Sequence, residues 1–210
     1  VSSGDVHLRA ADPWAVRLFF GLTKPKIKIL GGVVAGEVDA VGEGVSRFKP
    51  GDQIFGSTGM QFGGYAEYVC LPENATLAEK PENISWKEAA SIPFGGNTAL
   101  YFLRKANIRP GQKVLIYGAS GAVGSAAVQL AKSFGAEVTG VCSTANIDLV
   151  KSLGAGSVID YTKQDFSTLG KRYDVIFDTV GKSPFSGSVK SLGKNGYYLK
   201  KATGQSGMNK

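Results

Sequence analysis

Residues Lys113–Ser143, KVLIYGASGAVGSAAVQLAKSFGAEVTGVCS, contain a complete strand–turn–helix–strand pattern. Apolar residues run from Val114 to Tyr117 between polar neighbours, as in a buried strand. Helical spacing then relates the apolar side chains between Val123 and Ala131, and a second apolar run covers residues 138–142. The stretch therefore predicts one right-handed βαβ unit.

Three glycines, Gly118, Gly121 and Gly124, follow the first of these strands at intervals of three. Without a Cβ, such a turn lets a pyrophosphate approach backbone N–H groups and the positive end of the next helix. The third glycine lets that helix pack close to the strand. Glycine spacing alone is a weak signal, but its place between a strand and a helix favours nucleotide binding over a turn without a ligand.

The second strand ends on polar residues rather than on an acid. Dinucleotide-binding folds that use NAD place a carboxylate about 20 positions after the glycines, where it holds the ribose. Here Ser143, Thr144 and Asn146 follow the strand, and the first acid is Asp148. No carboxylate in this loop would repel a 2′-phosphate, and two hydroxyl groups can donate to one. The loop predicts NADP rather than NAD, the alternative being a polar loop that contacts only water.

The composition excludes several classes of protein. The chain of 210 residues has a net charge of +7, but its Lys and Arg are scattered, which favours a solvated basic surface over nucleic-acid or membrane binding. Cys70 and Cys142 lie too far apart in the sequence for a disulfide framework or a metal knuckle, which suits a reducing, cytoplasmic compartment. No apolar run is long enough to span a membrane, and no signal peptide is recognisable.

The pattern before the βαβ unit changes at Ser85. Residues 31–79 alternate between apolar and polar side chains, with glycine turns about every ten residues, as in an all-β barrel-like unit that includes a strand at 63–69. A capping box, Ser85 to Glu88, then begins a helix that we expect to break at Pro93–Gly96 before a second helix from Thr98 to Ala106. Before residue 31 we expect a strand end and turn at 1–9 and a short helix at 14–22.

Strands and helices alternate after the βαβ unit as well. Helices are predicted at 147–153 and 188–192, strands at 158–161, 175–179 and 197–199, and a loose polar tail at 200–210. Alternating strands and helices predict a parallel, doubly wound sheet, so that the chain as a whole is of the α/β class.

Taken together, these motifs resemble the medium-chain dehydrogenase/reductase superfamily, in its zinc-independent quinone oxidoreductase-like branch. Besides the glycine turn, the motifs are Ala35–Val38, Phe48–Asp52, Gly63–Tyr68, Glu88–Pro93 and Asp174–Gly181. The resemblance implies a GroES-like catalytic or substrate domain at 1–92 and an NADP-binding Rossmann domain at 93–210. Family members are longer, so we expect both domains to be partial here. The family also implies a homodimer formed through Rossmann strand edges.

Zinc-dependent members of this superfamily carry Gly-His-Glu where this chain has Gly31-Gly32-Val33. The ligand His is thus replaced by Gly32, and His7 is the only histidine of the chain. One histidine cannot build a zinc site. No metal is predicted.

The resemblance also assigns candidate site residues. For NADP these are Gly118, Ala119, Ser120, Gly121, Ala122 and Val123 at the pyrophosphate, Ser143, Thr144 and Asn146 at the 2′-phosphate, Tyr161 near the adenosine phosphate, and Asp178, Thr179 and Val180 at the ribose. Relatives often have a Lys where Ala145 or Asn146 stands here. Thr98 matches a threonine against the nicotinamide, and Ser2 stands where many relatives have an Asn. With Tyr65, these are the hydroxyl groups expected to polarise a substrate carbonyl.

Without a metal, the reaction must depend on the cofactor, with NADPH as the hydride donor. Suitable small-molecule acceptors are already electrophilic, namely quinones and α,β-unsaturated carbonyls. One alternative is a non-catalytic nucleotide-binding or structural protein, as in the recruitment of a relative as a lens crystallin. Another is a zinc-dependent alcohol dehydrogenase, against which Gly32 argues.

Overall fold

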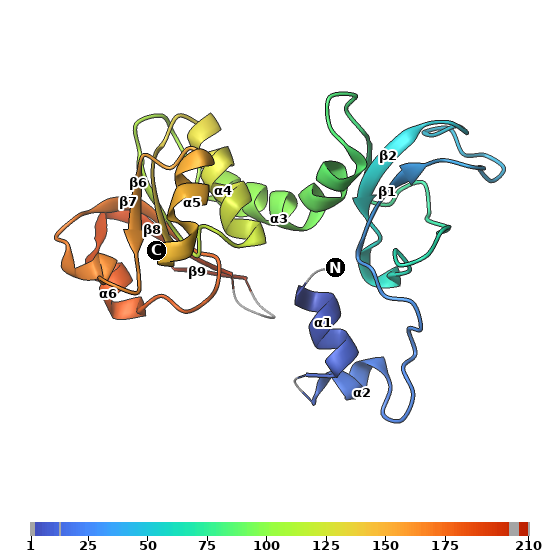
Figure 1. The fold of residues 1–210 in the computed structure, drawn as a ribbon, viewed down its shortest axis with the longest axis horizontal. Helices are drawn as coiled ribbons and strands as arrows, with labels where there is room; N and C mark the ends of the chain where they lie inside the picture. Colours follow the sequence, from blue (N-terminus) through green and yellow to red (C-terminus); the bar gives the residue numbers. More distant parts are fainter. Residues whose placement is uncertain (1–2, 13, 202–205, 210) are drawn as a thin grey trace. The chain divides into compact units, whose positions relative to one another are not determined.

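The computed structural model describes residues 3–12, 14–201 and 206–209 (Figure 1). The chain forms two compact units, Val1–Pro93 and Phe94–Lys210. Within the described residues, no helix is both long and apolar enough to cross a membrane.

The first unit is built around a small antiparallel sheet. It contains α1 (Ser3–Ala10), α2 (Val16–Phe20), β1 (Val33–Glu37), β2 (Gln53–Ser57), the 3-10 helix η1 (Gly59–Gln61) and β3 (Leu77–Glu79), with strand order β1-β2-β3. Val34 pairs with Gly56, which itself packs so closely on the chain that an added Cβ would lie 2.1 Å from the Thr76 carbonyl oxygen. The predicted β-rich unit is confirmed, as is the short helix before it.

Two predictions in this unit are wrong. Residues 63–69 form no strand, because Gly63 takes a φ of 89° and the N–H groups of 63–65 bond to the carbonyls of 29–31 instead. Residues 3–10 form α1 rather than a strand end and turn. The charges favour this helix, since Asp5 lies in its first turn and Arg9 in its last, each at the end of the helix dipole that it stabilises.

The helix α3 (Trp86–Lys105) passes through Pro93 without a break, so the predicted interruption at Pro93–Gly96 is wrong. A proline inside a helix removes one hydrogen bond and costs about 3 kcal/mol. Burial compensates for it, since Phe102 and Leu103, on the later turns, are almost fully enclosed in the core of the second unit. The capping box is confirmed.

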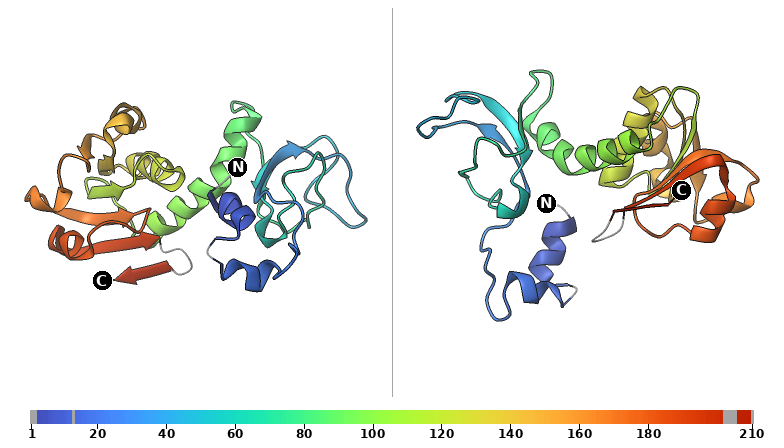
Figure 2. Two further views of the ribbon diagram at one scale, coloured as in Figure 1. Left: turned by 60° about the horizontal axis from the view of Figure 1, so that its bottom comes forward. Right: turned by 180° about the vertical axis from the view of Figure 1, so that it is seen from behind.

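The second unit contains a six-stranded sheet with the order β6-β5-β4-β7-β8-β9. Its strands are β4 (Lys113–Tyr117), β5 (Glu137–Cys142), β6 (Ser157–Asp160), β7 (Tyr173–Asp178), β8 (Leu192–Lys201) and β9 (Ser206–Asn209). The first five are parallel, which confirms the doubly wound prediction. β9 pairs antiparallel with β8, so the predicted loose tail is wrong for its described residues, 200–201 and 206–209 (Figure 2). The pairing gives the backbone of 206–209 hydrogen-bond partners that a loose tail would lack.

Helices and short 3-10 segments connect these strands and cover both faces of the sheet. They are α4 (Ala122–Ser133), η2 (Thr144–Asn146), α5 (Ile147–Ser152), η3 (Phe166–Thr168) and α6 (Phe185–Lys190). One face packs on α3, α4 and α5 through a core that includes Leu103, Val128 and Val150. The other face packs on Phe166, which contacts a second cluster with Leu115 and Ile176. The two cores fix the carboxyl ends of the parallel strands, where the candidate site lies.

Candidate functional site

The strand order places a crevice at the carboxyl ends of β4 and β7. From β4 the chain moves outward to β5 and β6 on one side, then returns to add β7 and β8 on the other. Ligands of doubly wound sheets bind at this kind of reversal, outside the carboxyl ends of the strands. Every cofactor-binding residue predicted from the sequence lies at this end of the sheet: in the turn after β4 and the start of α4, in the loop after β5, just after β6 (Tyr161), or at the end of β7 and in the loop that follows it.

Two of the three glycines in the turn after β4 are required by the packing of the chain itself. Gly118 has a φ of 81°, and a Cβ there would lie 2.3 Å from Val180 Cγ2. At Gly124 a Cβ would lie 2.0 Å from the Gly118 carbonyl oxygen. These contacts bring α4 against the strand, as the sequence predicts for the third glycine.

Gly121 differs from these two glycines, because neither its backbone conformation nor its packing requires a glycine. Its φ is −77°, and a Cβ would meet only the Gly118 carbonyl oxygen, at 3.4 Å. Gly121 is the N-cap of α4, and no side chain caps this end of the helix. The amides of the first turn are thus left for an outside acceptor, in the open space that a Cβ would enter. This turn fits a pyrophosphate.

The six predicted pyrophosphate residues divide by burial. Ser120, Gly121 and Ala122 are at least partly exposed, whereas the side chains of Ala119 and Val123 are buried in the core. The N–H groups of Gly118 and Ala119 both donate to the Val141 carbonyl, at 3.0 and 2.9 Å. The buried side chains therefore shape the turn, while the exposed residues and the backbone amides at the start of α4 remain for a ligand.

The loop after β7 is held by the carboxylate of Asp178, which is fully buried. Its two oxygens accept the N–H groups of Val180, Gly181 and Ser183, at 2.8 to 3.1 Å, and the Ser183 hydroxyl, at 2.8 Å. Thr179 donates its hydroxyl to the Tyr117 carbonyl, at 2.8 Å, and so ties the loop to β4. Asp178 and Thr179 are thus committed to the shape of the loop, while the Val180 side chain is 52% exposed.

The loop after β5 orients Ser143 and Thr144 differently. Asn146 Nδ2 donates to Ser143 Oγ at 3.0 Å, which leaves the Ser143 hydroxyl hydrogen for another acceptor. The Thr144 hydroxyl instead donates to Asp160 Oδ2. In this structure Thr144 therefore has no hydrogen left for a phosphate, which corrects the expectation that both hydroxyls can donate.

The sequence reasoning missed Asp160, an acid that lies beside this loop although it is 16 residues from Thr144. Asp160 pairs with Cys142 across β5 and β6, and the residue that follows each strand enters the same region. Hydrogen bonds from Thr144 and then Thr162 hold the Asp160 pKa below its ordinary value. A carboxylate at the end of the third predicted strand was visible in the sequence, but its neighbours depend on the strand register.

Tyrosines lie next to this acid. Tyr161 directly follows Asp160, is exposed, and has its ring centroid 6.5 Å from that of Tyr117. Burial, followed by the charge of Asp178, raises the Tyr117 pKa. Burial also raises the pKa of the Cys142 thiol, so this cysteine is a packing residue. Cys70, the other cysteine, is exposed, and both are free thiols.

The structure describes two of the three candidate catalytic hydroxyls, those of Tyr65 and Thr98. Ser2 lies outside the described residues. The Tyr65 hydroxyl, in the first unit, donates to Asp5 Oδ2 at 2.8 Å. The Thr98 hydroxyl, in the second unit, donates to the Phe94 carbonyl one turn earlier in α3, at 2.8 Å. The hydrogens of both described hydroxyls are thus engaged, and polarising a substrate carbonyl would require exchange of one of these bonds.

No metal centre can be assembled from the part of the chain that the structure describes, which contains no group of three or more His, Cys, Asp or Glu side chains suitably placed. At the position of the expected ligand, Gly31 donates its N–H to Asp5 Oδ1 at 3.3 Å, and Gly32 offers no side chain.

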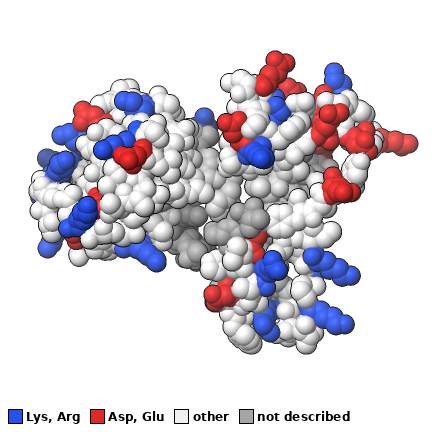
Figure 3. All heavy atoms as spheres, viewed as in Figure 1, with Lys and Arg blue, Asp and Glu red and all other residues white. Residues whose placement is uncertain are grey.

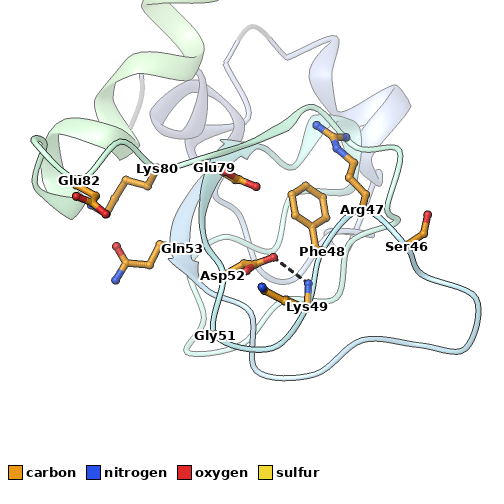
Figure 4. Close-up of a pocket in the computed structure, with 10 residues that line it drawn as sticks. All are labelled: Ser46, Arg47, Phe48, Lys49, Gly51, Asp52, Gln53, Glu79, Lys80 and Glu82. Carbon is orange, nitrogen blue, oxygen red and sulfur yellow. Dashed lines mark hydrogen bonds between the residues drawn. The ribbon is translucent and has the colours of Figure 1, made fainter.

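A hollow of about 560 Å³ in the first unit is lined by none of the predicted site residues (Figure 4). Several of its polar groups are engaged by the chain around it; Lys80 Nζ, for example, donates to the Pro81 and Ile84 carbonyls at 3.1 and 3.0 Å. Lys49 donates its N–H to Asp52 Oδ2 at 2.9 Å, and the Arg47 guanidinium lies 4.7 Å from the centre of the Phe48 ring. We therefore assign it to the packing of this turn.

Known proteins resemble the chain over both units. Residues 3–82 match the alcohol dehydrogenase GroES-like domain, and residues 122–204 match the family described as zinc-binding dehydrogenase. The chain belongs to the medium-chain dehydrogenase/reductase superfamily, in its quinone oxidoreductase-like branch. Both the predicted family and the predicted fold, a GroES-like domain followed by a Rossmann domain, are confirmed.

Individual members of the superfamily cover different shares of the chain. The 2-methylene-furan-3-one reductase of Solanum lycopersicum is 42% identical over 71% of this chain and 40% of its own length. The chloroplastic NADPH-dependent alkenal/one oxidoreductase of Arabidopsis thaliana is 40% identical over 70% of this chain and 40% of its own. The quinone oxidoreductase structure from Coxiella burnetii aligns with a TM-score of 0.85 and 32% identity over 97% of this chain and 64% of that one. The chain thus spans well under two thirds of the two curated relatives.

Proposed function

We propose that this protein is an NADPH-dependent, zinc-independent oxidoreductase that reduces a quinone or an α,β-unsaturated carbonyl compound. The observation that carries the proposal is the uncapped first turn of α4 behind Gly121, at the reversal of the sheet. The names of its relatives, which include quinone and alkenal/one oxidoreductases, support the substrate class.

The residues of the turn after β4 would hold the cofactor. Amides at the start of α4 and the positive end of its dipole stabilise a pyrophosphate. The loop held by Asp178 would shape the ribose wall through Val180, and Ser143 would donate to a 2′-phosphate. When bound, the reduced cofactor supplies the hydride.

The protein's further contribution would be orientation and polarisation. A quinone or a conjugated carbonyl accepts a hydride without a metal if its oxygen is stabilised as charge develops. Tyr65 is the described candidate for this role in the first unit, and its hydroxyl would exchange its hydrogen bond to Asp5 for one to the substrate oxygen. Gly32 in place of a zinc ligand supports the metal-free mechanism.

The test is calorimetric titration of the full chain with NADPH and with NADH, followed by turnover with a benzoquinone and with a 2-alkenal. We expect tight binding of NADPH, weak binding of NADH, and turnover that persists in the presence of EDTA. Binding of NADPH without turnover of either substrate would favour a nucleotide-binding protein without catalysis. Turnover that requires added zinc would contradict the proposal.

A further inference from the structure

The turn after β6 brings a lysine to the loop that follows β5. Lys163 Nζ lies 3.9 Å from Asp160 Oδ2, the oxygen that also accepts the Thr144 hydroxyl. The two groups form an ion pair between a largely exposed ammonium and a nearly buried carboxylate. This lysine is not among the residues predicted to bind the cofactor.

Hydrogen bonds join the turn and the loop into one surface. Tyr161 donates its N–H to the Cys142 carbonyl at 3.1 Å, which continues the β5–β6 pairing beyond the strands. The Thr162 and Thr144 hydroxyl oxygens lie 3.3 Å apart. Lys163 is the next residue, so its position relative to Ser143 and Thr144 is set by the sheet rather than by a free loop.

The partners of Asp160 make its charge a fixed feature of this surface. One carboxylate oxygen accepts both the N–H and the hydroxyl of Thr162, at 2.9 and 2.7 Å, and the other accepts Thr144. The Asp160 side chain is only 7% exposed. Since Asn146 is neutral, the surface would repel a 2′-phosphate unless another cation compensated for this carboxylate.

Lys163 has the properties required of that cation. Its side chain is 68% exposed, so it can move toward a ligand. At 3.9 Å its contact with Asp160 is electrostatic and longer than a hydrogen bond, so the contact leaves the three N–H donors of the ammonium to other acceptors. A mobile ammonium beside an oriented Ser143 hydroxyl matches the needs of a phosphate dianion.

We propose that Lys163 binds the 2′-phosphate of NADPH, together with Ser143, and so determines the preference for NADPH over NADH. The inference rests on the proposed function and deepens it, because it supplies the cation that relatives often carry where Ala145 or Asn146 stands here. It also gives Asp160 and Thr144 a role, which is to position the turn rather than to contact the phosphate.

The test is Lys163→Gln in the full chain, with Lys171→Gln as the matched control. Lys171 is equally an exposed lysine of the second unit, but it precedes β7 and so lies at the amino ends of the parallel strands, opposite their carboxyl ends. We expect Lys163→Gln to raise the Kd for NADPH about tenfold, the size of one charge-assisted hydrogen bond, with the Kd for NADH unchanged. Lys171→Gln should alter neither constant.

Two fragments isolate the phosphate from the nicotinamide. Adenosine 2′,5′-bisphosphate should lose affinity in Lys163→Gln, whereas 5′-AMP should not. Adding Asn146→Lys to Lys163→Gln should restore most of the lost affinity, because it returns a cation to the same surface. Circular dichroism spectra that match the wild type establish that the variants fold.

The outcomes separate this inference from the proposed function. If the wild-type chain prefers NADPH and Lys163→Gln keeps that preference, the role of Lys163 is wrong and the proposed function stands. An equal loss of NADPH and NADH binding would likewise overturn it. If the wild-type chain binds NADH as tightly as NADPH, both the cofactor proposal and this inference fail.

Discussion

Gly121 and Gly124 stand three residues apart in the same turn, yet their missing side chains serve different purposes. A Cβ at position 121 would meet only the Gly118 carbonyl oxygen, at 3.4 Å, whereas at position 124 it would lie 2.0 Å from that atom. The nucleotide-binding reading of this turn could be predicted from the sequence. The packing role of Gly124 could be predicted as well. That Gly118 also serves packing could not, because its close neighbour Val180 is distant in the sequence.

We predict that Gly121→Ala impairs cofactor binding without unfolding the protein. The φ of −77° suits alanine, so the free energy of unfolding should change by less than about 1 kcal/mol. NADPH affinity should fall at least tenfold, because the Cβ enters the space before the α4 amides. The matched variant Gly124→Ala should lower stability by about 1–3 kcal/mol through overpacking. Thermal unfolding measures the stability of both variants, and titration measures their affinity for NADPH. A Gly121→Ala protein that binds NADPH as tightly as the wild type would contradict the prediction.

Thr144 shows what the sequence alone could not reveal. Its hydroxyl follows a strand that ends at a cofactor loop, which predicts a ligand contact. The partner that it finds, Asp160, becomes its neighbour only through the β5–β6 register. The strand, turn and helix around the glycines could be predicted because their sequence signals are local, whereas the contacts of Thr144 and Lys163 cross between strands.

We predict that Thr144→Val weakens stability in a pH-dependent manner. Thr144 is the largest contributor to the lowered Asp160 pKa, whose ordinary value is 3.8. A carboxyl group with a lowered pKa in the folded state stabilises the protein above its ordinary pKa, and this contribution is lost as the pH falls through the folded value. The urea midpoint of Thr144→Val should therefore lie below that of the wild type near neutral pH, and the gap should narrow below about pH 4.

The control for this experiment is Thr168→Val. The Thr168 hydroxyl donates to the Asp165 backbone carbonyl at 2.8 Å, and that acceptor does not titrate. Any loss of stability in Thr168→Val should thus be constant with pH. If the difference in urea midpoint between Thr144→Val and the wild type is also constant with pH, the hydrogen bond from Thr144 does not lower the Asp160 pKa.

Among the elements, α3 separates what local signals determine from what tertiary packing determines. Its start could be predicted, since Ser85 Oγ accepts the Glu88 N–H at 3.3 Å and the Glu88 carboxylate accepts the Ser85 N–H at 2.8 Å. The continuation of α3 through Pro93 could not be predicted, because it depends on the burial of side chains that lie more than two turns later in the helix. The missing strand at 63–69 has the same kind of cause, a pairing with residues 29–31 that are distant in the sequence.

We predict that Ser85→Ala destabilises the protein by about 1 kcal/mol, because the helix loses its side-chain cap. Ser91→Ala is the matched control within the same helix. The Ser91 hydroxyl donates only to the Glu88 carbonyl, at 2.7 Å, and alanine is the better helix former, so this change should be neutral or slightly stabilising. Chemical denaturation measures both variants, and equal midpoints would show that the capping box contributes nothing.

On the scale of the whole molecule, the net charge of +7 is unequally divided. The unit Phe94–Lys210 carries 15 Lys and Arg against 6 Asp and Glu, a net charge of +9, whereas the unit Val1–Pro93 carries 9 against 11, a net charge of −2. On the face drawn in Figure 3 the basic side chains are spread out rather than gathered into one patch. The basic excess thus belongs to the unit with the uncapped α4, where it would attract an anionic cofactor over a distance.

We predict that salt weakens cofactor binding in two separable parts. Raising NaCl from about 0.02 to 0.3 M shortens the screening length from about 20 Å to about 6 Å and should slow the association of both NADH and NADPH, since both are attracted by the +9 unit. NADPH should lose more affinity than NADH, because its 2′-phosphate also meets the exposed Lys163. Stopped-flow fluorescence at several salt concentrations measures how the association rate and the affinity of each cofactor depend on salt. In Lys163→Gln the affinity for NADPH should depend on salt no more steeply than the affinity for NADH. The slowing of association by salt, which both cofactors share, should remain. If neither cofactor responds to salt, the charge of this unit has no part in their capture, and the 2′-phosphate is recognised by neutral donors such as Ser143.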